Sequence, residues 1–333
     1  MQRQRRAFQL AFFALFLAAP ALNLLRFDLH ETQLWVLGMR WTLGIDAFRA
    51  GEISANEMAL RIVLRAFVPA LLLVATFLGV AWRYGRLYCG WLCPHFSLVE
   101  MLNGLLKRAC GRLSLWEREQ TPLAGGRTPD ARWWPVFLLS CVLLGFTWAI
   151  TLLSYLLPPA EIWANLVHGT LTGNQARFLG IATLVFSAEF MLARHFFCRF
   201  GCAVGLFQSL AWMANPRGRV VAFPRSGTPY VRGLPRTMTM GLERAHPSHC
   251  RTCDPPHGNA CDRACPMRLK PRNLKRRKFS CVQCGLCVDA CEDSQAAQRR
   301  EPLLYHAIGV EALRETIREG RGARVLARPA EAS

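Results

Sequence analysis

The sequence is poor in acidic residues and in charge as a whole. It has 22 Asp and Glu against 41 Lys and Arg, and only 19% of its 333 residues are charged while 52% are hydrophobic. This composition is too apolar for an average soluble protein. No two of the eight histidines are placed within the apolar runs to sandwich a haem.

The basic excess lies mostly in the C-terminal part. From Cys198 onward there are 23 Lys and Arg against 11 acidic residues, so this part carries +12 of the net charge of +19. No aromatic stacking set or groove-reading motif accompanies the charge, which argues against nucleic acid as a partner. Next to membrane segments, anionic lipid is the expected partner.

Four apolar runs are long enough to cross a bilayer, which takes about 20 residues. Backbone polar groups in lipid must be satisfied within the segment, so each run is expected to be a helix. A cleaved signal peptide is a poor alternative for the first, because no small-residue cleavage site closes it. The four expected spans are approximately 7–25, 62–82, 135–157 and 178–197.

The distribution of basic residues predicts the orientation of these helices. Three arginines precede the first run and eight Lys and Arg lie within 83–132, whereas 158–177 contains only Arg177. By the positive-inside rule, both termini should be cytoplasmic, in a multi-pass protein of a bacterial inner membrane. The run 34–45 is too short to span and carries Arg40, so we expect it at the outer interface.

The expected fold is mainly α: a four-helix transmembrane bundle followed by a small α+β domain like a two-cluster bacterial ferredoxin. The membrane domain covers 1–203, an interfacial helix and an irregular linker cover 204–249, and the ferredoxin-like domain covers 250–305. A helix and a basic tail occupy 306–333.

The strongest motif is Cys281-x2-Cys284-x2-Cys287-x3-Cys291, which is the bacterial two-cluster pattern. Structural zinc sites, the alternative, use cysteine pairs well apart in sequence. In the two-cluster pattern the fourth cysteine of each run ligates the other cluster. We therefore expect two 4Fe-4S clusters: one is held by Cys250, Cys253, Cys261 and Cys291, the other by Cys265, Cys281, Cys284 and Cys287.

Two departures from the minimal pattern concern spacing and packing. Seven residues separate Cys253 from Cys261, and Glu292 stands where a proline usually follows the last cysteine. Neither removes a ligand.

Two further cysteine pairs lie at the inner ends of the second and fourth apolar runs. They are Cys89-Gly-Trp-Leu-Cys93-Pro94 and Cys198-Arg-Phe-Gly-Cys202. Nearby arginines would favour thiolates, and gathered soft thiolates suit Cu(I), a further iron–sulfur cluster or a dithiol/disulfide couple. The other interpretation is that all four are packing residues.

The run 86–94, its counterpart at Cys198 and the paired ferredoxin motifs together resemble the membrane-bound polyferredoxins of the NapH/MauN and RdxA/FixG/CcoG types. The resemblance covers about 26–305, and 33–46 and 287–291 favour the second group. It implies an electron relay between a soluble donor or the quinone pool and a partner redox protein. The second group also implies copper reduction for oxidase assembly. Ala203 replaces the proline usual after the second pair.

Polar residues within the spans give two weaker hypotheses. A contact between Arg65 and Glu189 is expected, with a proton or quinone site as the alternative. His95 and His195, beside the cysteine pairs, are expected to be interfacial histidines rather than ligands. The basic run 268–278 either docks an acidic electron carrier or lies on anionic headgroups.

Overall fold

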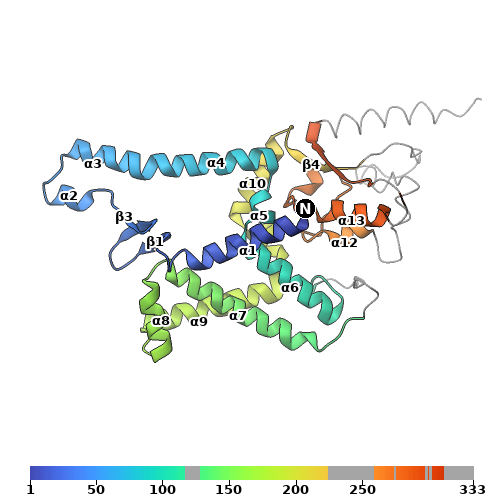
Figure 1. Ribbon diagram of the computed structural model, residues 1–333, viewed down its shortest axis with the longest axis horizontal. Helices are drawn as coiled ribbons and strands as arrows, with labels where there is room; N and C mark the ends of the chain where they lie inside the picture. The colour runs from blue at the N-terminus through green and yellow to red at the C-terminus, as the bar shows by residue number, and fades with distance from the viewer. Residues whose placement is uncertain (117–127, 224–258, 274, 297–298, 300–301, 311–333) are drawn as a thin grey trace, which may run out of the picture.

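The computed structural model describes residues 1–116, 128–223, 259–273, 275–296, 299 and 302–310, and these residues are mainly helical (Figure 1). Within them, three helices are long and apolar enough to cross a membrane. The first joins α3 (Ala55–Ile62), η1 (Val63–Phe67) and α4 (Val68–Tyr84). The others are α7 (Trp133–Ser154) and α9 (Gly173–Ala188), which η3 (Glu189–Ala193) extends. They match the second, third and fourth expected spans.

The first expected span differs from the observed helix. α1 covers Gln2–Ala18, which is 17 residues, and strand β1 already begins at Leu25. Pro20 has no N–H to continue the helix, and Asn23 turns the chain with a φ of 51°. At 1.5 Å per residue α1 is about 26 Å long, slightly less than the hydrocarbon thickness of about 30 Å.

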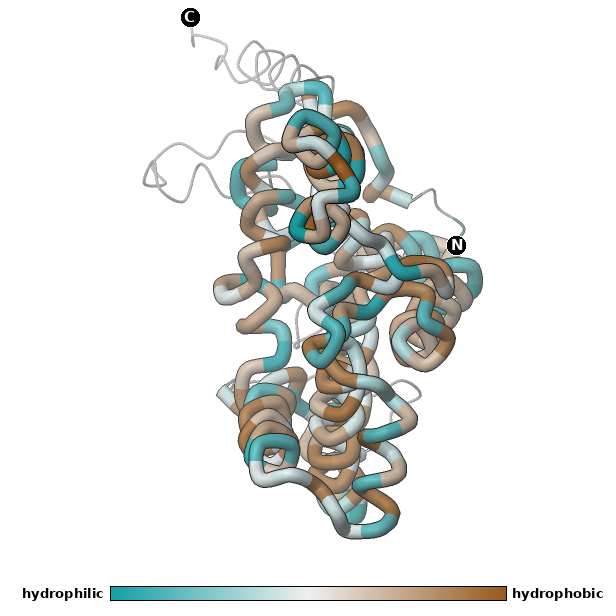
Figure 2. Tube along the Cα trace, turned by 90° about the vertical axis from the view of Figure 1, so that its left-hand side faces the viewer, coloured by the Kyte–Doolittle hydropathy of each residue, from teal (hydrophilic) through white to brown (hydrophobic). Residues whose placement is uncertain are grey.

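The long helices do not form one compact bundle. α7 packs along α9 and also contacts α6 (Pro94–Cys110), while α1 contacts α6 and α5 (Leu87–Trp91). The α3–η1–α4 rod runs apart from them, and its main partner is α10 (Ala203–Ala214), which contacts α4 (Figure 1). Hydrophobic residues are spread along the lengths of the helices (Figure 2). A core of Phe137, Trp148 and Phe190 holds the α6–α7–α9 group together.

At one end of the molecule lies a small antiparallel sheet with strand order β1-β2-β3. The expected interfacial run forms most of it: β2 is Gln33–Val36 and β3 is Met39–Trp41, next to β1 (Leu25–Asp28). Leu34 is paired with Phe27 on one side and with Trp41 on the other. Helices α2 (Ile45–Arg49) and α8 (Pro159–His168) lie at the same end (Figure 1).

The ferredoxin-like part lies at the opposite end (Figure 1). It contains α12 (Ala260–Ala264), η7 (Lys275–Lys278) and α13 (Leu286–Ala296). Strand β4 (Arg219–Ala222) pairs antiparallel with β5 (Tyr305–Ile308). β4 falls within the expected irregular linker, because four residues are too few for a periodic pattern and the strand is set by its distant partner. α10 is a helix where the sequence predicts one, and its interfacial position stays a prediction.

Candidate metal centre

Four of the expected cluster ligands line one narrow cavity. Cys265 follows α12, Cys281 and Cys284 lie in the loop before α13, and Cys287 is in the first turn of α13. Gln283 and Gly285 have positive φ values of 54° and 75°, which bend the loop around the cavity. Four thiols are the ligand number that a 4Fe-4S cluster requires, and the cavity brings all four together.

The other expected ligand set is described only in part. Cys261 of α12 and Cys291 of α13 pack in one buried core with Val221, Phe223 and Leu304. α12 and α13 also contact each other. Cys250 and Cys253 lie outside the described residues.

Cys265 and Cys281 lie in buried surroundings that favour the protonated thiol. Burial raises the pKa of the Cys281 thiol and raises that of Cys265 to about 11. The backbone N–H of Leu269 donates to Cys265 Sγ and that of Leu303 to Cys291 Sγ, each at 3.3 Å. A bound cluster would replace the protons, and such N–H···S bonds and burial would tune its potential.

The two further cysteine pairs, Cys89/Cys93 and Cys198/Cys202, are called the membrane-edge cysteines, and three of the four pack onto the same region. Cys89, Cys93 and Cys198 contact a buried core that includes Met267, Val282 and Cys284. Cys265 and Cys281 contact this core as well. Burial, followed by the neighbouring Cys93, raises the pKa of Cys89 to about 12. The pKa values of both Cys89 and Cys93 are also raised by Cys202, so the two pairs lie within electrostatic reach of each other.

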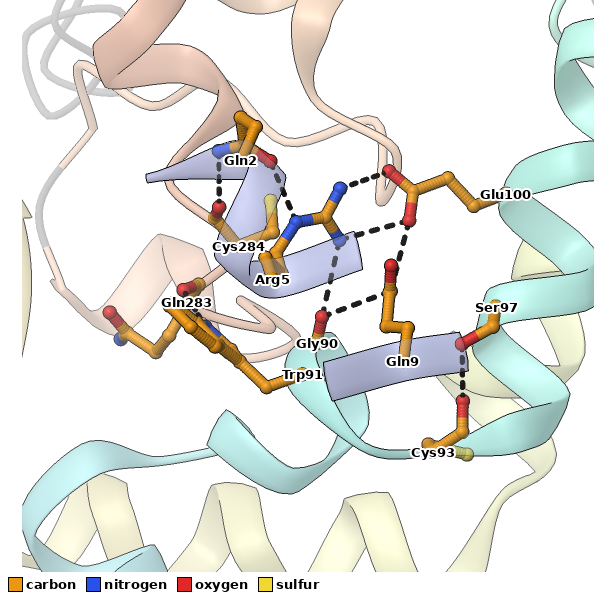
Figure 3. A network of polar contacts seen from close by, with 10 residues as sticks. All are labelled: Gln2, Arg5, Gln9, Gly90, Trp91, Cys93, Ser97, Glu100, Gln283 and Cys284. Carbon is orange, nitrogen blue, oxygen red and sulfur yellow. Dashed lines mark hydrogen bonds and ion pairs between the residues drawn. The ribbon is translucent and has the colours of Figure 1, made fainter. Parts of the chain in front are cut away.

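Contacts between backbone groups fix this arrangement. A Cβ on Gly90 would lie 2.0 Å from the carbonyl oxygen of Val282, so only glycine lets α5 approach the ferredoxin loop so closely. The Trp91 indole donates to the Gln283 carbonyl at 3.1 Å. From α1, Gln2 donates to the Cys284 carbonyl at 2.9 Å and Arg5 to the Gly90 carbonyl at 3.2 Å (Figure 3). Sequence reasoning treated Arg5 only as a topology signal.

Arg86 stands three positions before Cys89 and contacts the second cysteine pair. Its side chain is buried and donates to Ser209 Oγ and, at 2.6 Å, to the Cys198 carbonyl. Burial lowers the pKa of this guanidinium, while Cys89 and Cys202 act to raise it. Within the described ranges, no three His, Cys, Asp or Glu side chains stand together as for a single metal ion.

The expected contact between Arg65 and Glu189 is wrong. Arg65 donates to the Thr42 carbonyl at 2.9 Å beside the β sheet, whereas Glu189 lies 3.5 Å from His95 Nε2. Their helices run in the same direction, but Arg65 lies near the start of one and Glu189 near the end of the other. The His95 ring also stacks on Phe190, with centroids 5.3 Å apart. His195 is buried next to Arg194.

Two lysines of the basic run have structural roles. Lys278 is buried and donates to the Val221 and Pro271 carbonyls. Lys275 donates to the Trp212 carbonyl at 2.6 Å and lies over the Trp212 ring. They join the ferredoxin-like part to β4 and α10, and are therefore not simply a solvated face.

The comparisons with known proteins agree with this chemistry. Residues 66–112 match the family model of a 4Fe-4S binding domain, and this segment contains Cys89 and Cys93 rather than the ferredoxin motifs. The chain is 23% identical over 235 residues to the putative electron transport protein YccM of Escherichia coli (strain K12), which covers 67% of this chain and 53% of that protein.

It is also 26% identical over 219 residues to protein RdxA of Cereibacter sphaeroides, covering 63% of this chain and 41% of that protein. The chain thus matches about half the length of these curated relatives. No solved structure matches it. The resemblance to ferredoxin-type proteins is thereby confirmed: the chain contains a 4Fe-4S binding domain and is similar to a putative electron transport protein.

Proposed function

We propose that this protein is a membrane-anchored iron–sulfur protein that relays electrons between a soluble donor or the quinone pool and a partner redox protein. The observation that carries the proposal is the shared core of the two kinds of cysteine motif. Cys265, Cys281 and Cys284 contact it from the ferredoxin-like part, and Cys89, Cys93 and Cys198 contact it from the membrane edge. Redox groups held on both sides would be close neighbours.

In this proposal Cys250, Cys253, Cys261 and Cys291 hold one 4Fe-4S cluster, and Cys265, Cys281, Cys284 and Cys287 hold the other. The cavity shared by the second set, and the core shared by Cys261 and Cys291, support the assignment. The clusters would supply one-electron chemistry. The chain itself holds them, excludes water with Met267 and Val282, and donates backbone N–H groups to sulfur.

The membrane-edge cysteines would hold a third redox group. The match of 66–112 to a 4Fe-4S binding domain favours a further iron–sulfur cluster at Cys89, Cys93, Cys198 and Cys202. The second candidate function is copper reduction or assembly of a respiratory metalloenzyme. It is favoured by the burial of these soft sulfur ligands next to the ferredoxin loop. In either case the chain is an inner-membrane component of an oxidoreductase system with both termini cytoplasmic.

The test is anaerobic purification of the full chain, followed by iron and sulfide analysis and redox EPR. Two clusters predict about eight irons per chain, and a third at the membrane edge predicts about twelve. If a third cluster is present, the double variants C89S/C93S and C198S/C202S should each lose about four irons. Cys110→Ser is the matched control, because Cys110 only donates to the Leu106 carbonyl of its own helix.

The outcomes separate the candidates. Iron–sulfur content with no reversible reduction would overturn the relay. Cu(I) binding that vanishes in both double variants, with eight irons retained, would favour the copper function.

A further inference from the structure

A large hollow lies at the end of the molecule opposite the ferredoxin-like part. It has a volume of about 1000 Å³ and lies between the β1–β3 sheet with α2 on one side and the α3–η1–α4 rod on the other. Its walls are mainly apolar, and include Leu25, Val36 and Leu73. Nothing in the electron relay uses this hollow, which is remote from every cysteine discussed above.

The charges around the hollow are of one dominant sign. Three arginines line it, Arg49, Arg61 and Arg65, together with a single acidic residue, Asp46. Outside the lining, Arg26 pairs with Asp28 and Arg40 with Glu31 in the sheet. Arg61 also bonds Glu57 at 2.7 Å through one nitrogen, which leaves further guanidinium donors for a ligand.

A proline fixes the position of Arg65 in this wall. Pro69 lacks the N–H that an α-helix would direct to the Arg65 carbonyl, and the helix adopts π geometry over Val63–Phe67 just before it. The Trp41 indole donates to that carbonyl at 2.8 Å, and the Arg65 guanidinium donates to the Thr42 carbonyl at 2.9 Å. The end of β3 is therefore joined to the rod by two hydrogen bonds, one to the Arg65 carbonyl and one from the Arg65 guanidinium.

Gly44 leaves room for the Arg61 side chain in the wall of the hollow. Gly44, at the start of α2, has a φ of +83°, and a Cβ there would lie 3.1 Å from Arg61 Cδ. Larger residues would be strained in this backbone conformation and would push the Arg61 side chain away from the hollow.

The length of the rod places these arginines at the membrane surface. Its 30 residues would extend about 45 Å, which exceeds the hydrocarbon thickness of about 30 Å. The part from Arg65 to Tyr84 alone spans about 29 Å. If Tyr84 marks one boundary of the hydrocarbon, Arg65 lies at the other and Arg61 lies among the headgroups.

We propose that this hollow binds an anionic phospholipid of the surrounding bilayer. Arg49 and Arg61 hold the phosphate, and an acyl chain lies against the apolar wall that Leu25, Val36 and Leu73 form. Guanidinium groups match phosphate in charge and in hydrogen-bond geometry. The apolar wall requires a chain-bearing molecule rather than a free anion. Bound lipid would fill the space between sheet and rod and hold the otherwise exposed rod beside the rest of the molecule.

The test is native mass spectrometry of the full-length protein after delipidation in a non-ionic detergent. Phosphatidylglycerol, phosphatidylcholine and glycerol 3-phosphate are each titrated. The expected result is one phosphatidylglycerol bound at least about tenfold more tightly than phosphatidylcholine, because both lipids carry the phosphate but the arginines repel the choline cation of the second. Glycerol 3-phosphate should neither bind nor compete.

Two variants with matched controls locate the site. The double variant R49Q/R61Q should lose the preference for phosphatidylglycerol, while Arg40→Gln, outside the hollow, should keep it. Ala70→Trp, which fills the hollow, should weaken binding of both lipids, while Ala75→Trp on the same helix should not. Equal binding of the two phospholipids by the unchanged protein, binding of glycerol 3-phosphate alone, or an unchanged preference in R49Q/R61Q would overturn the proposal.

Discussion

Arg5 of α1 and Glu100 of α6 form a bidentate ion pair, with NH2···Oε1 at 2.6 Å and NH1···Oε2 at 2.9 Å (Figure 3). Arg5 is 1% exposed, and it also donates to the Gly90 carbonyl. The pair therefore fastens the first helix to the loop that carries Cys89 and Cys93.

Replacing Glu100 by Gln should destabilise the protein by about 2 kcal/mol. Breaking a buried pair usually costs about 3–5 kcal/mol, and the partial exposure of Glu100 reduces this. Thermal unfolding in detergent measures the change. Glu57→Gln is the control, since it breaks an exposed helical pair with Arg61 worth about 0.5 kcal/mol or less. Equal effects of the two substitutions would contradict the role given to Arg5.

Gly90→Ala should separate α5 from the ferredoxin loop, because the new Cβ would collide with the Val282 carbonyl. We expect loss of electron transfer and lower thermal stability. Gly104→Ala in α6 is the control: its Cβ meets nothing within 4 Å, so it should stabilise the helix by up to about 1 kcal/mol. Full activity of the Gly90 variant would show that this close approach is dispensable.

The local features of the fold could be predicted from the sequence, and the long-range ones could not. Apolar length located α4, α7 and α9, because that signal lies within one segment; cysteine spacing predicted Cys265 and Cys281 as ligands of one cluster, and the two line one cavity. The position of Lys278 depends on Val221, which is far away in sequence. For the same reason Arg65 was assigned a partner by charge alone, although a backbone carbonyl satisfies it.

Cys265→Ser should damage the cluster proposed for Cys281, Cys284 and Cys287, although Cys265 belongs to the other sequence motif. The reason is that Cys265 lines their cavity while Cys261 packs with Cys291. Redox EPR of the purified variant measures this, with Cys261→Ser as the counterpart that should affect the other cluster. Loss of the same cluster signal in both variants would mean that each motif binds its own cluster, because Cys261 and Cys265 belong to one motif.

His306 of β5 should make the ferredoxin-like part sensitive to acid. Burial, followed by the nearby Arg219, lowers its pKa to about 4, below the ordinary value of 6.5. The unfolded chain then binds more protons than the folded one between these values, so stability is full above pH 6.5 and falls as the pH drops toward 4. His306→Gln should flatten this slope in denaturation measured from pH 7 to pH 4. His168→Gln, at an exposed helix end, should leave it unchanged.

The proposed topology predicts the location of fused reporters. An alkaline phosphatase fusion after Ala160 should be active, because that segment would face the periplasm, and a fusion after Ser333 should be inactive. A green fluorescent protein at the same positions should give the reverse pattern. Phosphatase activity of the fusion after Ser333 would mean that the membrane orientation is the reverse of the proposed one.

The hydrogen bond from Gln2 to the Cys284 carbonyl connects residues 282 positions apart. Because α1 precedes the loop of Cys284 in the chain, it completes its contacts only after that loop has been synthesised. Such long-range closure is slow, and until then the segment with Arg5 lacks its final partners. A chain that fails to acquire its clusters would keep α1 without these contacts, which would expose this helix to membrane proteases.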